Sequence, residues 1–195
     1  MNSKQPKLRR LYPLLMKLTR LFGVYNRVQH NTSQVKPVKS FYHLQATQNN
    51  GQQILMQQYQ GKKVLIVNTA SQCGYTMQYG QLQQLHLQYP QLVILGFPAN
   101  DFKEQEQGND NDIAQFCEIN FGVTFPLMKK STVVKTGQQN EVFRWLSNRT
   151  ENGWNNVAPE WNFSKYLINE QGQLQGYFGS SVSPLSNTLI KAIKE

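Results

Sequence analysis

The stretch Val64-Leu-Ile-Val-Asn-Thr-Ala-Ser-Gln-Cys-Gly-Tyr-Thr76 begins as an apolar run and ends in small polar residues around one cysteine, Cys73. The run has the length and β-branched content of a buried strand, and residues 77–89 have helical spacing. Cys73 is therefore expected where a strand leads into a helix N-terminus. Unpaired backbone N–H groups and the helix dipole favour a thiolate there. We interpret Cys73 as a candidate nucleophile, because a buried structural cysteine fits poorly among such polar neighbours.

A second buried-type strand is predicted at Leu92–Phe97, after the helix. A strand, a helix and another strand in this order predict a right-handed βαβ unit with parallel strands. Ligands of open sheets of this kind bind beyond the carboxyl ends of the strands. Cys73 and Asn100 would both lie at that edge of the sheet.

The remaining patterns predict one α/β domain without internal repeats. The acidic turn at residues 109–112 favours a helix start, and the helix that follows carries Cys117. Turn residues and apolar periods place the other elements. They are a hairpin of Phe41–Leu44 and Gln53–Leu55 around Asn49-Asn-Gly51, helices over Ile113–Asn120 and Glu141–Asn148, a hairpin of Lys165–Asn169 and Leu174–Phe178, and a final helix from Pro184.

Length, charge and cysteine content restrict the class of protein. A chain of 195 residues suits one domain with an appendage. Its formal charge of +9 belongs to residues 1–39, because residues 40–195 carry equal numbers of acidic and basic residues. A neutral body argues against nucleic-acid binding. The chain has no apolar run long enough to span a bilayer, and its two cysteines are too few for a disulfide scaffold or a four-thiolate metal site.

We interpret residues 1–39 as a basic leader and linker and residues 40–195 as the folded domain. Residues 9–25 show a short basic amphipathic pattern, which predicts peripheral contact with an anionic membrane surface. A flexible basic tail explains the pattern equally well. A secretory signal is disfavoured, because the apolar run is short and no cleavage site follows. Residues 26–39 are polar and lack a strong period, which indicates a linker.

Four motifs resemble those of the glutathione peroxidase family, in the family's order and at compatible spacing over residues 41–195. They are Asn68-Thr-Ala-Ser-Gln-Cys-Gly-Tyr-Thr76, Gly96-Phe-Pro-Ala-Asn-Asp-Phe102, Gln105-Glu106 and Trp161-Asn-Phe163. The resemblance implies a thioredoxin-like α/β fold, in which a central mixed sheet is flanked by helices. It also implies reduction of hydroperoxides at the cysteine position. Lys103 departs from the pattern, because it stands where the family usually has glycine.

Carried over residue by residue, the resemblance places the catalytic residues of the family at Cys73, Gln105, Trp161 and Asn162. Amide and indole N–H groups suit this chemistry, because they donate to sulfur and peroxide oxygen without carrying charge. Taken alone, Trp161 would more often be a core aromatic, Asn162 a turn residue and Gln105 one glutamine among many. The same resemblance suggests a substrate pocket shaped by Asn100, Phe102 and Gly74.

Cys117 has two interpretations. A helical cysteine is usually an inert, small hydrophobic residue. The resemblance instead matches Cys117 to the cysteine that resolves the sulfenic acid in two-cysteine members of the family. The result would be a disulfide between Cys73 and Cys117, which thioredoxin would reduce better than glutathione can. Glutathione is the second candidate reductant. Because distant cysteines must approach closely to form a bond, we predict that residues 109–120 unfold locally in the oxidised form.

The sequence therefore predicts a thiol peroxidase that reduces hydrogen peroxide and organic or lipid hydroperoxides and serves in the response to oxidative stress. A peroxide sensor that oxidises a partner protein would use the same residues. A disulfide exchanger would normally show C-x-x-C, which is lacking here, and a silent binding module fits poorly with four matching catalytic positions. No cofactor other than the thiol reductant is expected. The absence of the longer insertion of tetrameric members favours a monomer, and we expect a cytoplasmic protein rather than an exported one.

Overall fold

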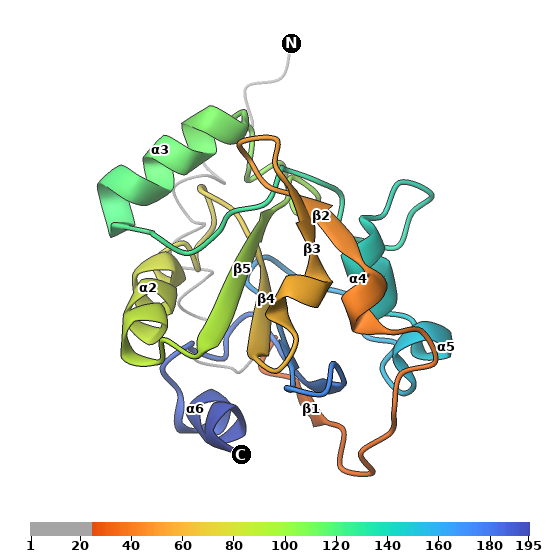
Figure 1. The fold of residues 1–195 in the computed structure, drawn as a ribbon. Coiled ribbons are helices and arrows are strands. Elements are labelled where there is room, and N and C mark those ends of the chain that lie inside the picture. Colours follow the sequence, from red (N-terminus) through yellow and green to blue (C-terminus); the bar gives the residue numbers. More distant parts are fainter. Residues whose placement is uncertain (1–24) are drawn as a thin grey trace.

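The computed structural model describes residues 25–195, so the amphipathic pattern over residues 9–25 lies, apart from Tyr25, outside the described residues. The described chain forms a five-stranded sheet in the order β1-β7-β6-β4-β5 and a separate two-stranded sheet, β2-β3. Figure 1 shows helices on both sides of the larger sheet. Parallel and antiparallel pairs both occur in it, which confirms the predicted mixed α/β sheet.

The strand that leads to Cys73 is β4 (Lys63–Thr69), and all seven of its residues are buried. It pairs in parallel with β5 (Leu92–Pro98) and antiparallel with β6 (Lys165–Ile168). Helix α2 (Gln78–Gln88) connects β4 to β5, which confirms the predicted βαβ unit. Because β4 is covered on both faces, its sequence is a continuous apolar run without strand-like alternation.

Several short helices complete the fold. The helix predicted over residues 141–148 ends before residue 148 in the structure, and a separate helical turn follows it. The final helix begins after Pro184, because the Ser186 hydroxyl caps it by accepting from the N–H of Leu189. The helical elements beyond α2 are η1 (Phe41–His43), η2 (Met56–Tyr59), α3 (Asp110–Phe121), α4 (Glu141–Leu146), α5 (Arg149–Asn152) and α6 (Asn187–Lys194).

Two hydrophobic clusters fill the space on either side of the sheet. Successive side chains of a strand point to opposite faces, so β4 contributes to both clusters. Leu65 and Val67 pack with residues of α2, α3 and α6. Val64 and Ile66 pack with residues of α4 and the small hairpin. The strand that precedes Cys73 is therefore held from both faces.

The late hairpin is confirmed, because β6 pairs antiparallel with β7 (Leu174–Phe178). The predicted linker over residues 26–39 is wrong for one part: β1 (Val28–His30) pairs antiparallel with β7 at the edge of the sheet. Three residues are too few to show a period of two in the sequence, and backbone pairing places them. The folded body therefore begins before residue 40.

The first predicted hairpin is partly wrong. Its turn is correct, because β2 (Gln45–Thr47) and β3 (Gln53–Leu55) flank Gly51, which adopts a positive φ of 88°. The first strand was expected at Phe41–Leu44, where the structure instead has η1. The Ser40 hydroxyl caps this turn by accepting from the N–H of Tyr42, and the fully buried Phe41 anchors it in the core.

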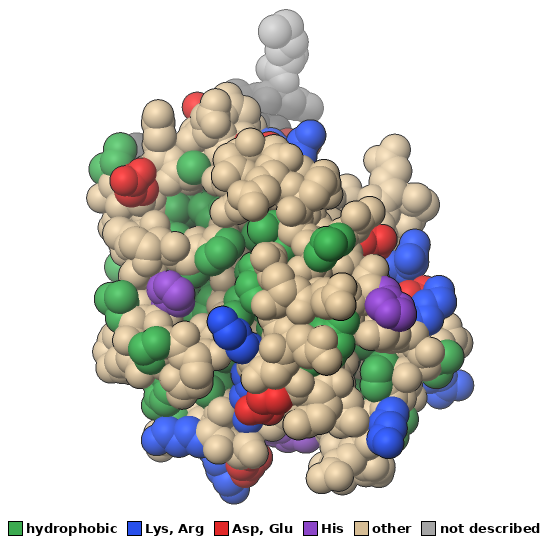
Figure 2. Space-filling model, in the orientation of Figure 1, with side chains coloured by type: hydrophobic (Ala, Val, Ile, Leu, Met, Phe, Trp, Pro, Cys, Tyr) green, Lys and Arg blue, Asp and Glu red, His purple; other side chains and the backbone are tan. Residues whose placement is uncertain are grey.

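Basic and acidic side chains are interspersed on the face shown in Figure 2. This arrangement agrees with the balanced charge of residues 40–195. No helix within residues 25–195 combines the length and the hydropathy needed to cross a bilayer.

Candidate active site

Cys73 lies in a turn between β4 and α2, as the sequence predicts. Its backbone N–H donates to the Thr76 hydroxyl at 3.0 Å, and that hydroxyl donates to the Ala70 carbonyl at 2.9 Å. The backbone N–H of Tyr75 donates to the sulfur of Cys73 at 3.4 Å, and such a donor stabilises negative charge on sulfur. With 9% of its surface exposed, Cys73 is shielded from bulk water but accessible to a small molecule.

Gln105 is brought to this turn by the loop that follows β5. The backbone N–H of Gln72, next to Cys73, donates to the carbonyl of Gln105 at 3.0 Å. Lys103 and Glu104 both adopt a φ of 53°, in the left-handed region that glycine occupies most easily. This geometry fits the glycine that the family resemblance implies at position 103. Such a strained turn is typical of functional sites, and here it directs the chain toward the cysteine.

Asn162 is the second amide among the predicted catalytic residues. Its Nδ2 donates to Oε1 of Gln105 at 3.0 Å, and both residues are buried. The structure thus joins two predicted site residues that lie far apart in the sequence. Phe163, which follows Asn162, has a φ of 66°, so another backbone outlier occurs beside a predicted catalytic residue.

Asn68, a residue that the sequence analysis did not assign to the site, holds this loop in place. Its side chain donates to the carbonyl of Trp161 at 3.2 Å and accepts from the N–H of Ser164 at 2.9 Å. Its own carbonyl accepts from the N–H of Phe163 at 2.6 Å. The signal was present in the sequence, because an asparagine within a buried apolar strand must satisfy its polar atoms.

Two polar atoms at the centre of this group have no hydrogen-bond partner within the described chain. They are Nε1 of Trp161 and Oδ1 of Asn162, and both atoms are buried. Trp161 also packs against the hydrophobic cluster that contains Cys73. An unpaired indole N–H in such a place is available to donate to an incoming oxygen atom.

The predicted pocket residues divide into two groups. Phe102 lies beside Trp161, with ring centroids 5.6 Å apart, and Gly74 is exposed next to Cys73. The side chain of Asn100 binds the protein backbone, because its Oδ1 accepts from the N–H of Glu106 at 2.9 Å. Asn100 therefore shapes the loop that carries Gln105.

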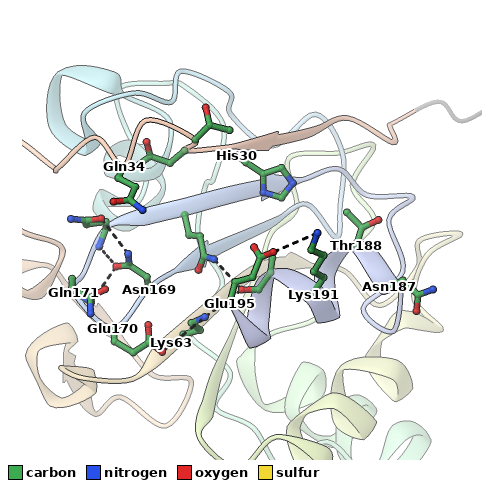
Figure 3. A pocket seen from close by; sticks show the side chains of 15 residues that line it. His30, Gln34, Lys63, Asn169, Glu170, Gln171, Asn187, Thr188, Lys191 and Glu195 are labelled. Carbon is green, nitrogen blue, oxygen red and sulfur yellow. Dashed lines mark hydrogen bonds and ion pairs between the residues drawn. The ribbon is translucent and has the colours of Figure 1, made fainter.

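A polar cavity of about 960 Å³ lies elsewhere (Figure 3). It surrounds Lys63, the first residue of β4, and therefore lies at the opposite end of the strand from the Cys73 turn. Polar side chains such as Asn169 and Lys191 line it, and the predicted site residues are not among its lining residues. This cavity is separate from the candidate active site.

Glu106 is a second positioning residue, and its role was not predicted. One carboxylate oxygen accepts from the backbone N–H of Ser71 at 2.8 Å and from its hydroxyl at 2.9 Å. Burial raises the pKa of Glu106 to about 6, although the bonds from Ser71 and the charge of Lys130 oppose this shift. Glu106 thus ties the loop after β5 to the turn that carries Cys73.

Cys117 lies on α3 and is fully buried in the same hydrophobic cluster as Cys73. Burial raises the pKa of Cys117 to about 12, and a hydrogen bond with Tyr79 opposes this shift. Neither cysteine forms a disulfide in this structure. Because the thiolate is the nucleophilic form, this burial disfavours reaction of Cys117 as it is packed here. Within residues 25–195, the structure shows no group of three potential metal ligands.

Comparison with known proteins shows the family of this chain. The family model of glutathione peroxidase matches residues 41–147. A glutathione peroxidase-like peroxiredoxin of Saccharomyces cerevisiae is 40% identical over 162 residues, which cover 81% of this chain and 99% of that protein. A glutathione peroxidase-like peroxiredoxin of Chlamydomonas reinhardtii is 44% identical over 75% of this chain and 90% of that protein.

Solved structures are similar in fold. The crystal structure of apo Trgpx is 32% identical, covers 81% of this chain and 97% of its own, and superposes with a TM-score of 0.61. A thioredoxin family protein of Chlorobium tepidum is only 15% identical, with a TM-score of 0.57, and covers 82% of this chain and 94% of its own, so it shows the fold alone. The chain belongs to the glutathione peroxidase family and has a thioredoxin-like fold. Its predicted class, a peroxidase among the oxidoreductases, is confirmed.

The raised pKa of Glu106 predicts a specific pH dependence of stability. A carboxyl that binds its proton more tightly when folded stabilises the protein below its unfolded pKa, and this contribution is lost as the pH rises through 6. Raising the pH from about 4 to about 7 should lower the free energy of unfolding of the wild type by about 2 kcal/mol relative to Glu106→Gln. Urea unfolding at several pH values measures this difference.

The glutamine variant retains an oxygen that accepts from Ser71. Glu104→Gln, at the exposed neighbouring position, is the matched control and should follow the wild type. Parallel pH profiles for the wild type and Glu106→Gln would contradict the assignment of the titration to Glu106.

Proposed function

We propose that Cys73 is the nucleophile that reduces hydrogen peroxide and organic or lipid hydroperoxides, and that Gln105, Trp161 and Asn162 assist it. The observation that carries this proposal is the buried hydrogen bond between Gln105 and Asn162, beside an indole N–H without a partner. These neutral donors are linked through Gln72 to the turn that holds the cysteine. A peroxide oxygen between them would receive hydrogen bonds without a competing charge.

The first step forms a sulfur–oxygen bond and breaks the oxygen–oxygen bond. The Cys73 thiolate attacks the terminal oxygen of the hydroperoxide, and the departing alkoxide takes up a proton to leave as an alcohol. Cys73 is thereby oxidised to a sulfenic acid. The unpaired Nε1 of Trp161 and the amides of Gln105 and Asn162 stabilise the charge that develops on the oxygen atoms.

In the second step, Cys117 resolves the sulfenic acid. Its thiolate attacks the sulfur of Cys73, a disulfide forms and the oxygen leaves as water. The buried thiol with its raised pKa requires that α3 open first. The packing of α3 favours such opening, because only Ile113 and Cys117 are buried among its twelve residues. Hydrogen bonds at its start also stabilise α3, because Asn109 and Asp112 form a capping box.

Thioredoxin is the proposed reductant of the disulfide between Cys73 and Cys117, and glutathione is the alternative. A dithiol protein reduces an intramolecular disulfide through a mixed disulfide and then releases itself by forming its own disulfide. The opening of α3 would expose one sulfur to such a partner. No cofactor beyond this thiol reductant is needed for the cycle.

The two cysteines have separable roles that substitution distinguishes. Cys73→Ser should abolish the fast reaction with hydrogen peroxide, because its hydroxyl is not a nucleophile at neutral pH. Cys117→Ser should retain fast oxidation of Cys73 and lose thioredoxin-linked turnover. Stopped-flow oxidation followed by coupled turnover measures both steps.

Equal oxidation rates for the wild type and Cys73→Ser would disprove the peroxidase proposal. Persistent thioredoxin-linked turnover in Cys117→Ser would remove Cys117 from the cycle and leave the first step intact. Turnover with glutathione alone would identify the other reductant.

We also propose that residues 9–25 attach the protein to an anionic membrane surface from the cytoplasmic side, as a monomer. The support is the basic amphipathic pattern of these residues together with the position at which they join the domain. Tyr25, the last of them, stacks on Trp161 with ring centroids 5.7 Å apart. A bound leader would therefore hold the active site near the membrane surface, where lipid hydroperoxides occur.

Membrane attachment predicts a difference between anionic and neutral vesicles. Full-length protein should sediment with phosphatidylserine-containing vesicles and lose this binding as salt is raised, because basic side chains are screened. A variant with Arg9, Arg10, Lys17 and Arg20 changed to glutamine should remain in the supernatant. Equal binding by both proteins, or binding to neutral vesicles only, would refute the proposal.

A further inference from the structure

The chain passes Trp161 before it enters the sheet. Residues 25–27, here called the crossing segment, precede β1 and lie outside residues 41–147, which match the family model. The segment is fixed to the loop after β7 by backbone pairing. The N–H of Ser181 donates to the carbonyl of Tyr25 at 3.1 Å, and the N–H of Gly179 donates to the carbonyl of Arg27 at 2.7 Å.

The aromatic ring of Tyr25 stacks on the indole of Trp161. The centroids are 5.7 Å apart and the planes differ by 14°. Phe102 lies near the same indole at a tilted 46°, and the Lys103 ammonium lies 5.8 Å from its centroid. Stacked and tilted rings at these distances attract each other beyond the burial of their area. The plane of the indole is therefore set by ring contacts.

Ring contacts are decisive here, because the polar atom of Trp161 contributes nothing to its orientation. Its Nε1 has no hydrogen-bond partner among residues 25–195. The backbone of Trp161 is held through its carbonyl by Asn68, which leaves rotation of the side chain unconstrained by hydrogen bonds. Without Tyr25, fewer contacts would keep the indole N–H directed toward the peroxide.

The crossing segment shows two further signs of a specific arrangement. Tyr25 has a φ of 64°, a conformation that a tyrosine adopts only where its surroundings compensate for the strain. Arg27 pairs with Glu160, the residue before Trp161, at 3.1 Å. The chain also approaches Gly179 so closely that a Cβ there would lie 2.1 Å from the carbonyl oxygen of Tyr25.

We propose that Tyr25 is a positioning residue that orients the Trp161 indole for peroxide reduction. This inference rests on the proposed function of Cys73 and extends it to a residue ahead of the matched family region. Tyr25 acts through Trp161 and does not itself contact the reacting atoms. The part of the chain that precedes the domain is thereby coupled to the rate of the reaction at Cys73.

Stopped-flow oxidation of the full-length protein by hydrogen peroxide tests this proposal. Tyr25→Ala should oxidise about three- to tenfold more slowly than the wild type, because a stacked pair is lost. Tyr25→Phe keeps the ring and should stay within about twofold of the wild-type rate. His30→Ala is the matched control, because it removes another ring of the same stretch that contacts Phe178 rather than Trp161, and its oxidation rate should equal that of the wild type.

The most informative measurement is the oxidation rate of the double variant that combines Tyr25→Ala with Trp161→Phe. If Tyr25 acts through the indole N–H, its loss should have little further effect once that donor is gone. Gly179→Ala tests the same role by a second substitution. Its Cβ would displace the crossing segment, so it should slow oxidation as Tyr25→Ala does. Circular dichroism confirms that each variant is folded.

The outcomes separate this inference from the function on which it rests. If the wild type reacts no faster than Cys73→Ser, the proposed function fails. If the wild type and Tyr25→Ala both react rapidly and at the same rate, only the positioning role of Tyr25 is overturned. The same holds if Tyr25→Ala and Trp161→Phe slow the reaction independently of each other.

Discussion

The site depends on one buried polar side chain, that of Asn68 at the end of β4. An amide in a strand covered on both faces must find partners, and Asn68 finds them in the loop that carries Trp161 and Asn162. The same strand continues directly into the turn of Cys73. A single buried strand therefore positions the proposed nucleophile covalently and its proposed donors by hydrogen bonds, and Gln105 is joined to both groups.

Burial gives the two cysteines opposite properties. Cys73 is slightly exposed and accepts a backbone N–H, whereas Cys117 is sealed in the core with its pKa raised to about 12. In the proposed cycle, the first thiol reacts in the folded protein, and the second reacts only after α3 opens. Packing would thus impose an order on the two proposed steps, and the small number of buried residues on α3 favours its opening.

The sequence predicted the elements whose patterns are strong. The apolar runs of β4 and β5, the helix between them and the late hairpin were all placed correctly. It did not predict β1, which is three residues long and is held by pairing with β7. Nor did it assign roles to Asn68, Glu106 or Tyr25, because their contacts join residues far apart in the chain. The resemblance to the family supplied Gln105, Trp161 and Asn162, which composition alone would not distinguish.

We propose that the neutral donors around Cys73 activate it toward peroxide. The most direct measurement is the second-order rate constant for oxidation of Cys73 by hydrogen peroxide in Asn162→Ala, compared with the wild type. Removal of this buried donor should lower the rate constant by at least about tenfold while the protein stays folded. An unchanged rate constant in a folded Asn162→Ala protein would contradict the account.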